Sequence, residues 1–277
     1  MRTSKNKILK KNQLSKLVNR FSKNFVVEEI ERNLRNNQTT NLLTNDINDN
    51  PFIKNALIST EVINNVGNSI TKNGLSSNPL VVRKKKDFYE IVLGRKRLLA
   101  SKKIGIPQVP VIIINISDEE MLLMLLADNR EQKEGNVIEM AMILQELNKT
   151  YGYDQKTLAE IAHQSRSQIT NILRILNLPT HIINDIAIGK LSYGHARAII
   201  SLPEDTIEQL TKKIYQDKLS VREVEYLAKK KHKNGNKNNS VLLLNKFTST
   251  LEIKDKSVTV NFDNNKERDE FLKEIHK

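Results

Sequence analysis

The sequence predicts an α+β protein built from several domains, and three observations indicate this class. Short apolar strands alternate with amphipathic helices over residues 42–134. Helical spacing then takes over, and it includes two short helices joined by a tight turn within 154–178. Two short strands of alternating polarity and one helix follow within 250–275. We therefore expect a mixed α/β domain, an all-α helix-turn-helix domain and a small ββα unit.

Shifts in composition suggest where these parts begin and end. No acidic residue precedes Glu28, and the stretch up to Asn41 is polar. A second polar, Lys-rich stretch follows the helical region. The expected parts are a basic flexible tail over 1–41, a mixed α/β domain over 42–134, a helical domain over 135–230, a linker over 231–240 and a C-terminal unit over 241–277.

The overall composition restricts the classes of function. A net charge of +13 favours a polyanionic partner, which is either nucleic acid or an anionic membrane surface. The chain contains no Cys, which excludes disulfides and thiolate metal sites and suits a reducing compartment. No apolar run reaches membrane-spanning length, and the N-terminus lacks the apolar core of a signal peptide. We expect a cytoplasmic protein without stable membrane insertion.

The mixed domain can be followed element by element. Apolar spacing predicts a helix from Thr60, and Gly74 is the usual residue just after a helix end. Runs of β-branched and aromatic residues predict strands, and the helices between them stop at glycine or at polar residues. The expected elements are helix 60–72, strands 80–83 and 88–93, a helix from Gly94 to Gly105, strand 109–116 and helix 118–127.

Gly94 begins the first chemical motif, Gly-Arg-Lys-Arg, between an expected strand and a helix. Glycine lets the backbone approach an anion, and the N–H groups of a helix start can bind phosphate oxygens together with the three cations that follow. Asp128 and Asn129 could offer oxygen ligands to a Mg²⁺ bound with phosphates. Taken singly, a basic surface turn and a helix C-terminal turn are the simpler interpretations.

The helix pair within 154–178 predicts a DNA-binding helix-turn-helix. Asp154 is the expected N-cap of the first helix, and Ser165 with Gln168 forms a capping box for the second. In such a motif, the N-terminal part of the second helix enters the major groove. Arg166 and Asn171 lie on that part together with polar neighbours. An ordinary amphipathic hairpin within a helix bundle is the alternative.

The C-terminal unit is expected to pair with a second copy. Its two strands, 250–254 and 257–262, read as a hairpin, and Asn264 with Glu267 predicts the start of a helix. Because two strands and one helix are marginally stable alone, a symmetric homodimer is the simplest arrangement.

Five segments in one order resemble the ParB family of chromosome and plasmid partition proteins. They are GLSSNPLVVRK, YEIVLGRKRLLASKKIG, LLADNREQKEGNVIEMA, the helix pair and KLSYGHARAII. The resemblance runs from about Asn50 to about Lys230. It implies binding to a palindromic centromere site called parS, CTP and Mg²⁺ as cofactors, closure into a sliding DNA clamp, and nucleoid association. It also implies a ParA-type ATPase as partner, with a condensin-type SMC complex as a further partner.

The resemblance also implies site residues. For the nucleotide they are Gly74, Asn78, Arg83, Gly94, Arg95, Lys96, Arg97, Asp128 and Asn129, of which Asp128 and Asn129 would also hold the metal. For DNA they are Lys156, Ser165, Arg166, Ser167, Gln168, Asn171, Arg174, Gly194, His195 and Arg197. For stimulation of the ATPase they are Lys16, Arg20 and Lys23.

Several positions depart from the family pattern and bear on nucleotide binding or hydrolysis. The family's Gly-Glu-Arg-Arg has Arg95 in place of its Glu, which is the residue linked to nucleotide hydrolysis. The family's Glu-Asn-x-x-Arg begins here with Asp128 and ends in Gln132, so one phosphate cation is missing. Its Gln-Pro before the strand is Asn78-Pro79, and its upstream Gln-Pro-Arg is replaced by residues 53–55. A cation at position 95 cannot orient a water as a base. We expect CTP binding with weak or absent hydrolysis, and with Arg95 as one of the phosphate cations.

Two alternatives remain open from the sequence. One is a nucleoid-occlusion factor of the same superfamily, in which the basic N-terminal segment tethers DNA to the membrane. Arg166 and Gly194 are of the ParB type rather than the occlusion type. The other is a helix-turn-helix transcription regulator without nucleotide dependence.

Overall fold

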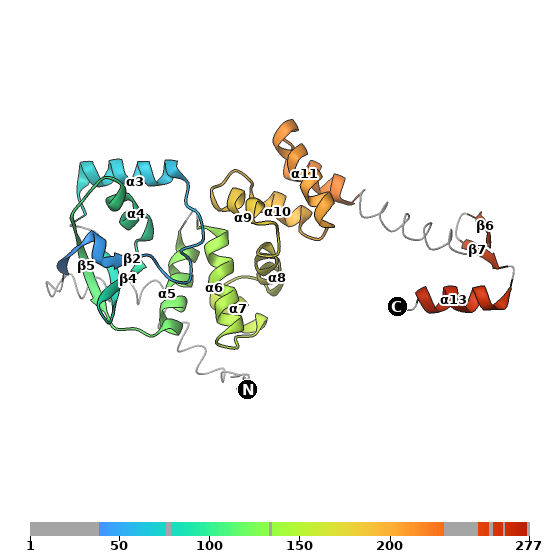
Figure 1. Cartoon of the computed structure of the whole chain (residues 1–277), viewed down its shortest axis with the longest axis horizontal. Helices are drawn as coiled ribbons and strands as arrows, with labels where there is room; N and C mark the ends of the chain where they lie inside the picture. The colour runs from blue at the N-terminus through green and yellow to red at the C-terminus, as the bar shows by residue number, and fades with distance from the viewer. Residues whose placement is uncertain are drawn as a thin grey trace. The chain divides into compact units, whose positions relative to one another are not determined.

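The computed structural model describes residues 39–75, 79–132, 135–229, 249–254, 257–262 and 264–275. These residues belong to two compact units, one up to Ile200 and one from Ser201 onward (Figure 1). Residues 1–38 of the expected basic tail and the 231–240 linker lie outside the described residues.

A mixed five-stranded sheet forms the centre of the N-terminal half of the first unit, in the order β1-β5-β3-β4-β2. β3 pairs antiparallel with β4 and parallel with β5. The strands are β1 Thr39–Leu43, β2 Ile47–Asn48, β3 Leu80–Lys85, β4 Phe88–Leu93 and β5 Gln108–Ile114. β1 occupies part of the stretch that the sequence predicts as tail. An edge strand tolerates this polar composition, which hides the usual apolar alternation.

Helices cover both faces of this sheet (Figure 1). They are α3 Thr60–Asn73, α4 Arg95–Lys103 and α5 Asp118–Glu131. Alternate residues of β3 point to opposite faces: Leu80 and Val82 join the core under α3 and α4, whereas Val81 joins the core that includes α5. A sheet covered on both faces explains why the three consecutive residues Leu80, Val81 and Val82 of β3 are all apolar.

The remaining helices of the first unit are α6 Val137–Lys149, α7 Gln155–Ala162, α8 Arg166–Ile175, α9 Thr180–Ala187 and α10 Tyr193–Ile199. α6 packs against α5, α7, α8 and α9. Its buried side chains, such as Ala141 and Leu144, share one core with α5 and with the helix pair. The α/β part and the helix-turn-helix therefore form a single packed body around α6.

The second unit carries the elements expected near the C-terminus. α11 Glu204–Asp217 and a helix over 221–229 come first, followed by β6 Ser249–Lys254, β7 Ser257–Phe262 and α13 Asn265–Ile275. β6 and β7 pair antiparallel as predicted, and Asn264 accepts a hydrogen bond from the backbone N–H of Glu267. Dimerisation through this unit stays a prediction. In the part of the chain that the structure describes, no helix is both long and apolar enough to cross a membrane.

Candidate functional site

Gly94 makes the tight connection between β4 and α4. Its φ of 97° lies in the left-handed region, and a Cβ there would stand 2.7 Å from Cδ2 of Leu80. Only glycine fits both restrictions. As in any α-helix, the first N–H groups of α4 have no acceptor within the helix. The turn at Gly94 therefore presents backbone donors at the start of a helix, as the motif predicts.

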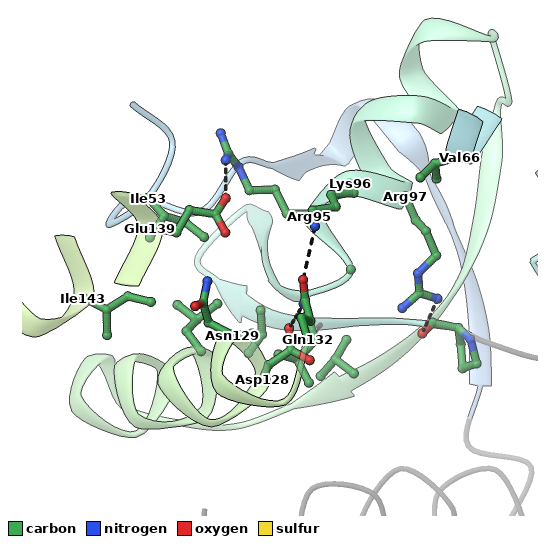
Figure 2. Close-up of a pocket in the computed structure, with 16 residues that line it drawn as sticks. Ile53, Val66, Arg95, Lys96, Arg97, Asp128, Asn129, Gln132, Glu139 and Ile143 are labelled. Atoms are coloured by element: carbon green, nitrogen blue, oxygen red, sulfur yellow. Dashed lines mark hydrogen bonds and ion pairs between the residues drawn. The ribbon is translucent and has the colours of Figure 1, made fainter. Parts of the chain in front are cut away.

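A cavity of about 410 Å³ lies against this helix start. Its walls come from α4, from the last turn of α5, from α6 and from the loop before α3 (Figure 2). Lys96 and Arg97 contribute positive charge, Asp128 and Glu139 contribute carboxylates, and the remaining wall is mostly apolar. The volume lies within the range of small-molecule sites, and the mixture of charge and apolar surface suits a ligand with both characters.

Hydrogen bonds join α4 to α5 across the cavity. Nζ of Lys96 donates to Oε1 of Gln132 at 3.2 Å, and Nε2 of Gln132 donates to Oδ2 of Asp128 at 2.7 Å (Figure 2). Burial raises the pKa of Asp128 above its ordinary value, although Gln132, Arg97 and Lys96 act in the opposite direction. Gln132 uses only Oδ2 of Asp128, so Oδ1 could bind a cation that enters with phosphates.

Asp128 and Asn129 lie in the last turn of α5, whereas the sequence places them after the helix end. Asn129 is 8% exposed, and its Nδ2 donates to the carbonyl of Asn136 at 3.2 Å. Gly135 approaches so closely that a Cβ would stand 2.5 Å from the backbone oxygen of Asn129. The connection from α5 to α6 is thus folded tightly onto the cavity.

Arg97 points toward the start of β3, where its Nη1 donates to the carbonyl of Pro79 at 3.3 Å (Figure 2). Burial lowers the pKa of Arg97 from its ordinary value, and Asp128 partly opposes this effect. The charge of a partly buried guanidinium beside a cavity is stabilised when an anion enters.

The structure brings together most of the predicted nucleotide residues, which are Gly94, Arg95, Lys96, Arg97, Asp128 and Asn129. Gly74 ends α3 and does not line the cavity. Arg83 is 2% exposed and is paired with Glu90 and Asp118, because its place in β3 directs it under α5 rather than into the cavity. Asn78 lies outside the described residues.

Arg95 differs from the expectation in its partners. It lines the cavity, but its guanidinium is paired with Asp49 at 2.8 Å and Glu139 at 2.7 Å. Sequence reasoning missed both carboxylates. No local pattern marks them, since they lie 46 and 44 residues from Arg95.

The helix pair has the predicted caps. Oδ1 of Asp154 accepts from the N–H of Thr157 at 2.7 Å, and Ser165 and Gln168 form the reciprocal capping box. His163 adopts a left-handed conformation, with φ of 52°, in the turn between α7 and α8. The turn and the start of α8 are therefore fixed by local bonds.

The predicted DNA residues lie mainly on exposed positions. Lys156, Ser165, Arg166, Ser167, Gln168 and Arg197 are exposed, whereas Asn171, Arg174, Gly194 and His195 are partly buried. Oε1 of Gln168 accepts from the N–H of Ser165 at 2.9 Å, so this oxygen is used by the cap. Oγ of Ser192 bonds Nδ1 of His195 at 2.8 Å, which gives His195 a structural role at the start of α10.

Known proteins match the chain over both parts of this unit. Residues 28–130 match the ParB N-terminal domain, and residues 133–233 match the ParB HTH domain. The "Probable chromosome-partitioning protein ParB" of Campylobacter jejuni is 34% identical over 194 residues, which cover 70% of this chain and 69% of that protein.

Two crystal structures of C-terminally truncated ParB from Caulobacter crescentus are also similar. One is complexed to the centromeric parS site, with 28% identity, a TM-score of 0.42, and coverage of 69% of this chain and 99% of that chain. The other is complexed with CTP-γ-S, with 27% identity, a TM-score of 0.32, and coverage of 62% and 98%. Since both family domains match in order and the Campylobacter protein is 34% identical over more than two thirds of its length, the chain belongs to the ParB family of chromosome-partitioning proteins.

Proposed function

We propose that this protein binds a palindromic centromere site of the parS kind through α8, binds CTP with Mg²⁺ in the cavity at the start of α4, and acts in chromosome or plasmid segregation. The main support for the proposal is that one helix, α6, contacts both α8 and the cavity. α6 packs against α8 and also supplies Glu139 and Ile143 to the cavity. Nucleotide and DNA would therefore bind to parts of one packed body.

The DNA part of the proposal rests on the capped, exposed start of α8. Arg166 and Asn171 are the candidates for contacts with base edges, and Lys156 is a candidate for a phosphate contact. Arg166→Ala should weaken binding to parS by about 1–3 kcal/mol and relax discrimination between sites. Lys156→Ala should weaken binding to all sequences alike and lower the salt dependence. Fluorescence anisotropy at matched salt measures both, and unchanged parS affinity for Arg166→Ala would refute the assignment.

The nucleotide part rests on the chemistry of the cavity. Lys96, Arg97 and the N–H groups at the start of α4 suit phosphates. Asp128 and Asn129 offer a carboxylate and an amide oxygen, a donor set that fits Mg²⁺ bound with phosphates. The family resemblance supplies the choice of cytidine. Calorimetric titration with CTP, with and without parS DNA, tests it; no binding in either case would favour a helix-turn-helix regulator without nucleotide dependence.

CTP turnover is proposed to be slow or absent. Orientation of an attacking water requires a carboxylate or an equivalent group, and Arg95 occupies the position of the family's Glu. The carboxylates that line the cavity are bonded to the protein: Asp128 to Gln132, and Glu139 to Arg95. Phosphate release in the presence of CTP and parS DNA measures this, and rapid release would contradict it.

The partners also remain proposals. The C-terminal ββα unit is expected to form a homodimer, which light scattering of the full chain against a 1–240 fragment would test. Lys16, Arg20 and Lys23 are expected to stimulate a ParA-type ATPase, and a condensin-type SMC complex is a further expected partner on the nucleoid. If deletion up to Asn24 left the stimulation intact, the stimulating segment would lie elsewhere. Strong liposome binding by the 1–24 peptide would favour the nucleoid-occlusion alternative.

A further inference from the structure

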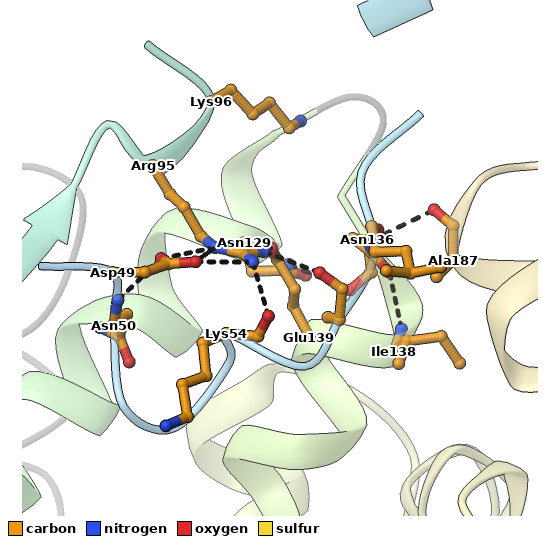
Figure 3. A network of polar contacts seen from close by, with 12 residues as sticks. Asp49, Asn50, Lys54, Arg95, Lys96, Asn129, Asn136, Ile138, Glu139 and Ala187 are labelled. Carbon is orange, nitrogen blue, oxygen red and sulfur yellow. Dashed lines mark hydrogen bonds and ion pairs between the residues drawn. The ribbon is translucent and has the colours of Figure 1, made fainter. Parts of the chain in front are cut away.

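Arg95 is bonded at every donor position of its guanidinium (Figure 3). Nε donates to Oδ1 of Asp49 at 2.8 Å; Nη1 donates to Oε1 of Glu139 at 2.7 Å and to the carbonyl of Ala56 at 3.0 Å. Nη2 donates to Oδ2 of Asp49 at 3.0 Å and to the carbonyl of Lys54 at 3.1 Å. A guanidinium has five N–H groups, and these contacts use all of them. We call this set of groups the Arg95 junction.

The Arg95 junction changes the role expected for this cation. The side chain is 10% exposed, and no N–H group remains for a phosphate oxygen. Burial alone would lower the pKa of Arg95, yet the carboxylates of Asp49 and Glu139 raise it above its ordinary value. The positive charge of Arg95 is therefore balanced by two directly bonded carboxylates, whereas Nζ of Lys96 is hydrogen-bonded to the neutral amide of Gln132.

The Arg95 junction connects three segments that are distant in the sequence. Arg95 begins α4, Asp49 and the two carbonyls belong to the loop before α3, and Glu139 lies in the first turn of α6. Asn136, the N-cap of α6, also contacts this loop, since its Nδ2 donates to the carbonyl of Leu57 at 3.2 Å. The loop and the start of α6 are thus held together, and both contribute to the wall of the cavity.

We propose that Arg95 is a positioning residue of the nucleotide site and not a phosphate ligand. It holds the 49–57 loop and the first turn of α6 against α4, which places Ile53, Glu139 and Ile143 around the ligand. Contact with the phosphates falls to Lys96 and Arg97. This inference rests on the proposed binding of CTP in the cavity, and it assigns to Arg95 a task that the family's Glu at this position cannot perform with the same carboxylate partners.

The experiment compares the affinities for CTP and CDP. Loss of a phosphate ligand should change the ratio of the two affinities, whereas loss of a positioning residue should lower both by the same factor. The double variant Arg95→Gln/Glu139→Gln removes the ion pair while the net charge of the cavity stays the same. It should weaken the binding of CTP and of CDP by the same factor, roughly tenfold, which corresponds to the loss of one charge-assisted hydrogen bond. The matched variant Lys96→Gln, on the adjacent residue, should weaken CTP more than CDP. Competition against a fluorescent CTP analogue gives both affinities.

The inference would be overturned if the double variant lowered the affinity for CTP relative to CDP, as Lys96→Gln is expected to do. Unchanged affinities for both nucleotides in the double variant would also overturn it. Lys103→Gln, which removes a charge from the exposed end of α4, serves as the control for nonspecific effects. If the double variant is poorly folded, Asp49→Asn should show the same pattern with a smaller loss.

Hydrogen exchange without nucleotide separates this inference from the proposed function. Failure of the parent to bind CTP or its analogue would refute the nucleotide site itself. In that case the Arg95 junction is still tested: faster exchange at 49–57 and at the first turn of α6 in the double variant would support it. Unchanged exchange at both segments would overturn it.

Discussion

Arg83 is buried and Arg95 is largely buried; each of these cations has two carboxylate partners, but they join different parts of the molecule. Arg83 is 2% exposed and connects β3 to Glu90 on the neighbouring strand and to Asp118 at the start of α5. Its Nη1 has no hydrogen-bond partner among the described residues. Arg95 has every donor bonded and connects three segments around a cavity. Burial and charge pairing are thus common to both, and only the place of Arg95 beside the cavity suggests a role in binding.

The largest effect is expected from Arg83→Met. The change leaves Glu90 and Asp118 without their buried cation, and loss of one partner from such a cluster costs about 3–5 kcal/mol of unfolding free energy. Denaturant unfolding measures this loss. The folded fraction should bind CTP as the parent does. A selective loss of CTP binding would show that Arg83 takes part in nucleotide binding, as the sequence predicts.

Arg95→Met should destabilise the protein less, by about 2 kcal/mol, because the side chain of Arg95 is 10% exposed whereas that of Arg83 is 2% exposed, and because Glu139 faces a cavity that water can enter. The same denaturant series gives the value. A loss equal to or above that of Arg83→Met would mean that the Arg95 junction is the main stabilising cluster, which would reverse the comparison.

The two clusters should respond to pH in opposite directions. Burial would raise the pKa of Asp118, but the bonds from Arg83 lower it below its ordinary value of 3.8, so its stabilising effect is lost as the pH falls through the lowered value. Burial raises the pKa of Glu139 above 4.5, so its contribution is greatest below that pH and falls as the pH rises through the raised value.

Unfolding free energies of the parent, Asp118→Asn and Glu139→Gln between about pH 3 and pH 7 test this contrast. The advantage of the parent over Asp118→Asn should shrink on acidification, whereas its advantage over Glu139→Gln should grow. Parallel curves for the two variants would contradict the assignment.

The smallest effect is expected from Lys85→Gln. Nζ of Lys85 lies 3.3 Å from Asp118, but the two side chains are 41% and 43% exposed. An exposed ion pair of this kind contributes less than about 0.5 kcal/mol. A loss above about 1 kcal/mol in the denaturant series would show that the exposed cation, and not Arg83, maintains the cluster.

The contrast also shows what the sequence could predict. Local patterns predicted α3, β3, β4, the turn at Gly94 and the capped helix pair, because spacing and caps depend on near neighbours. The edge strand β1 was missed, since its polar residues lack alternation. Glu139 and Asp49 were missed because their relation to Arg95 exists only after α6 and the 49–57 loop have packed on α4. The residue types around Gly94 indicated a phosphate site, but which cations remain for the ligand is a property of the tertiary structure.

The position of α6 has a consequence for how the protein is made. The matches to the two family domains meet between residues 130 and 133, yet Glu139 and Ile143 of the cavity wall lie beyond that boundary. During synthesis, the N-terminal domain leaves the ribosome before these residues do. It emerges with an incomplete cavity and with Arg95 still lacking one carboxylate. The proposed nucleotide site is therefore completed only when the next domain has begun to fold.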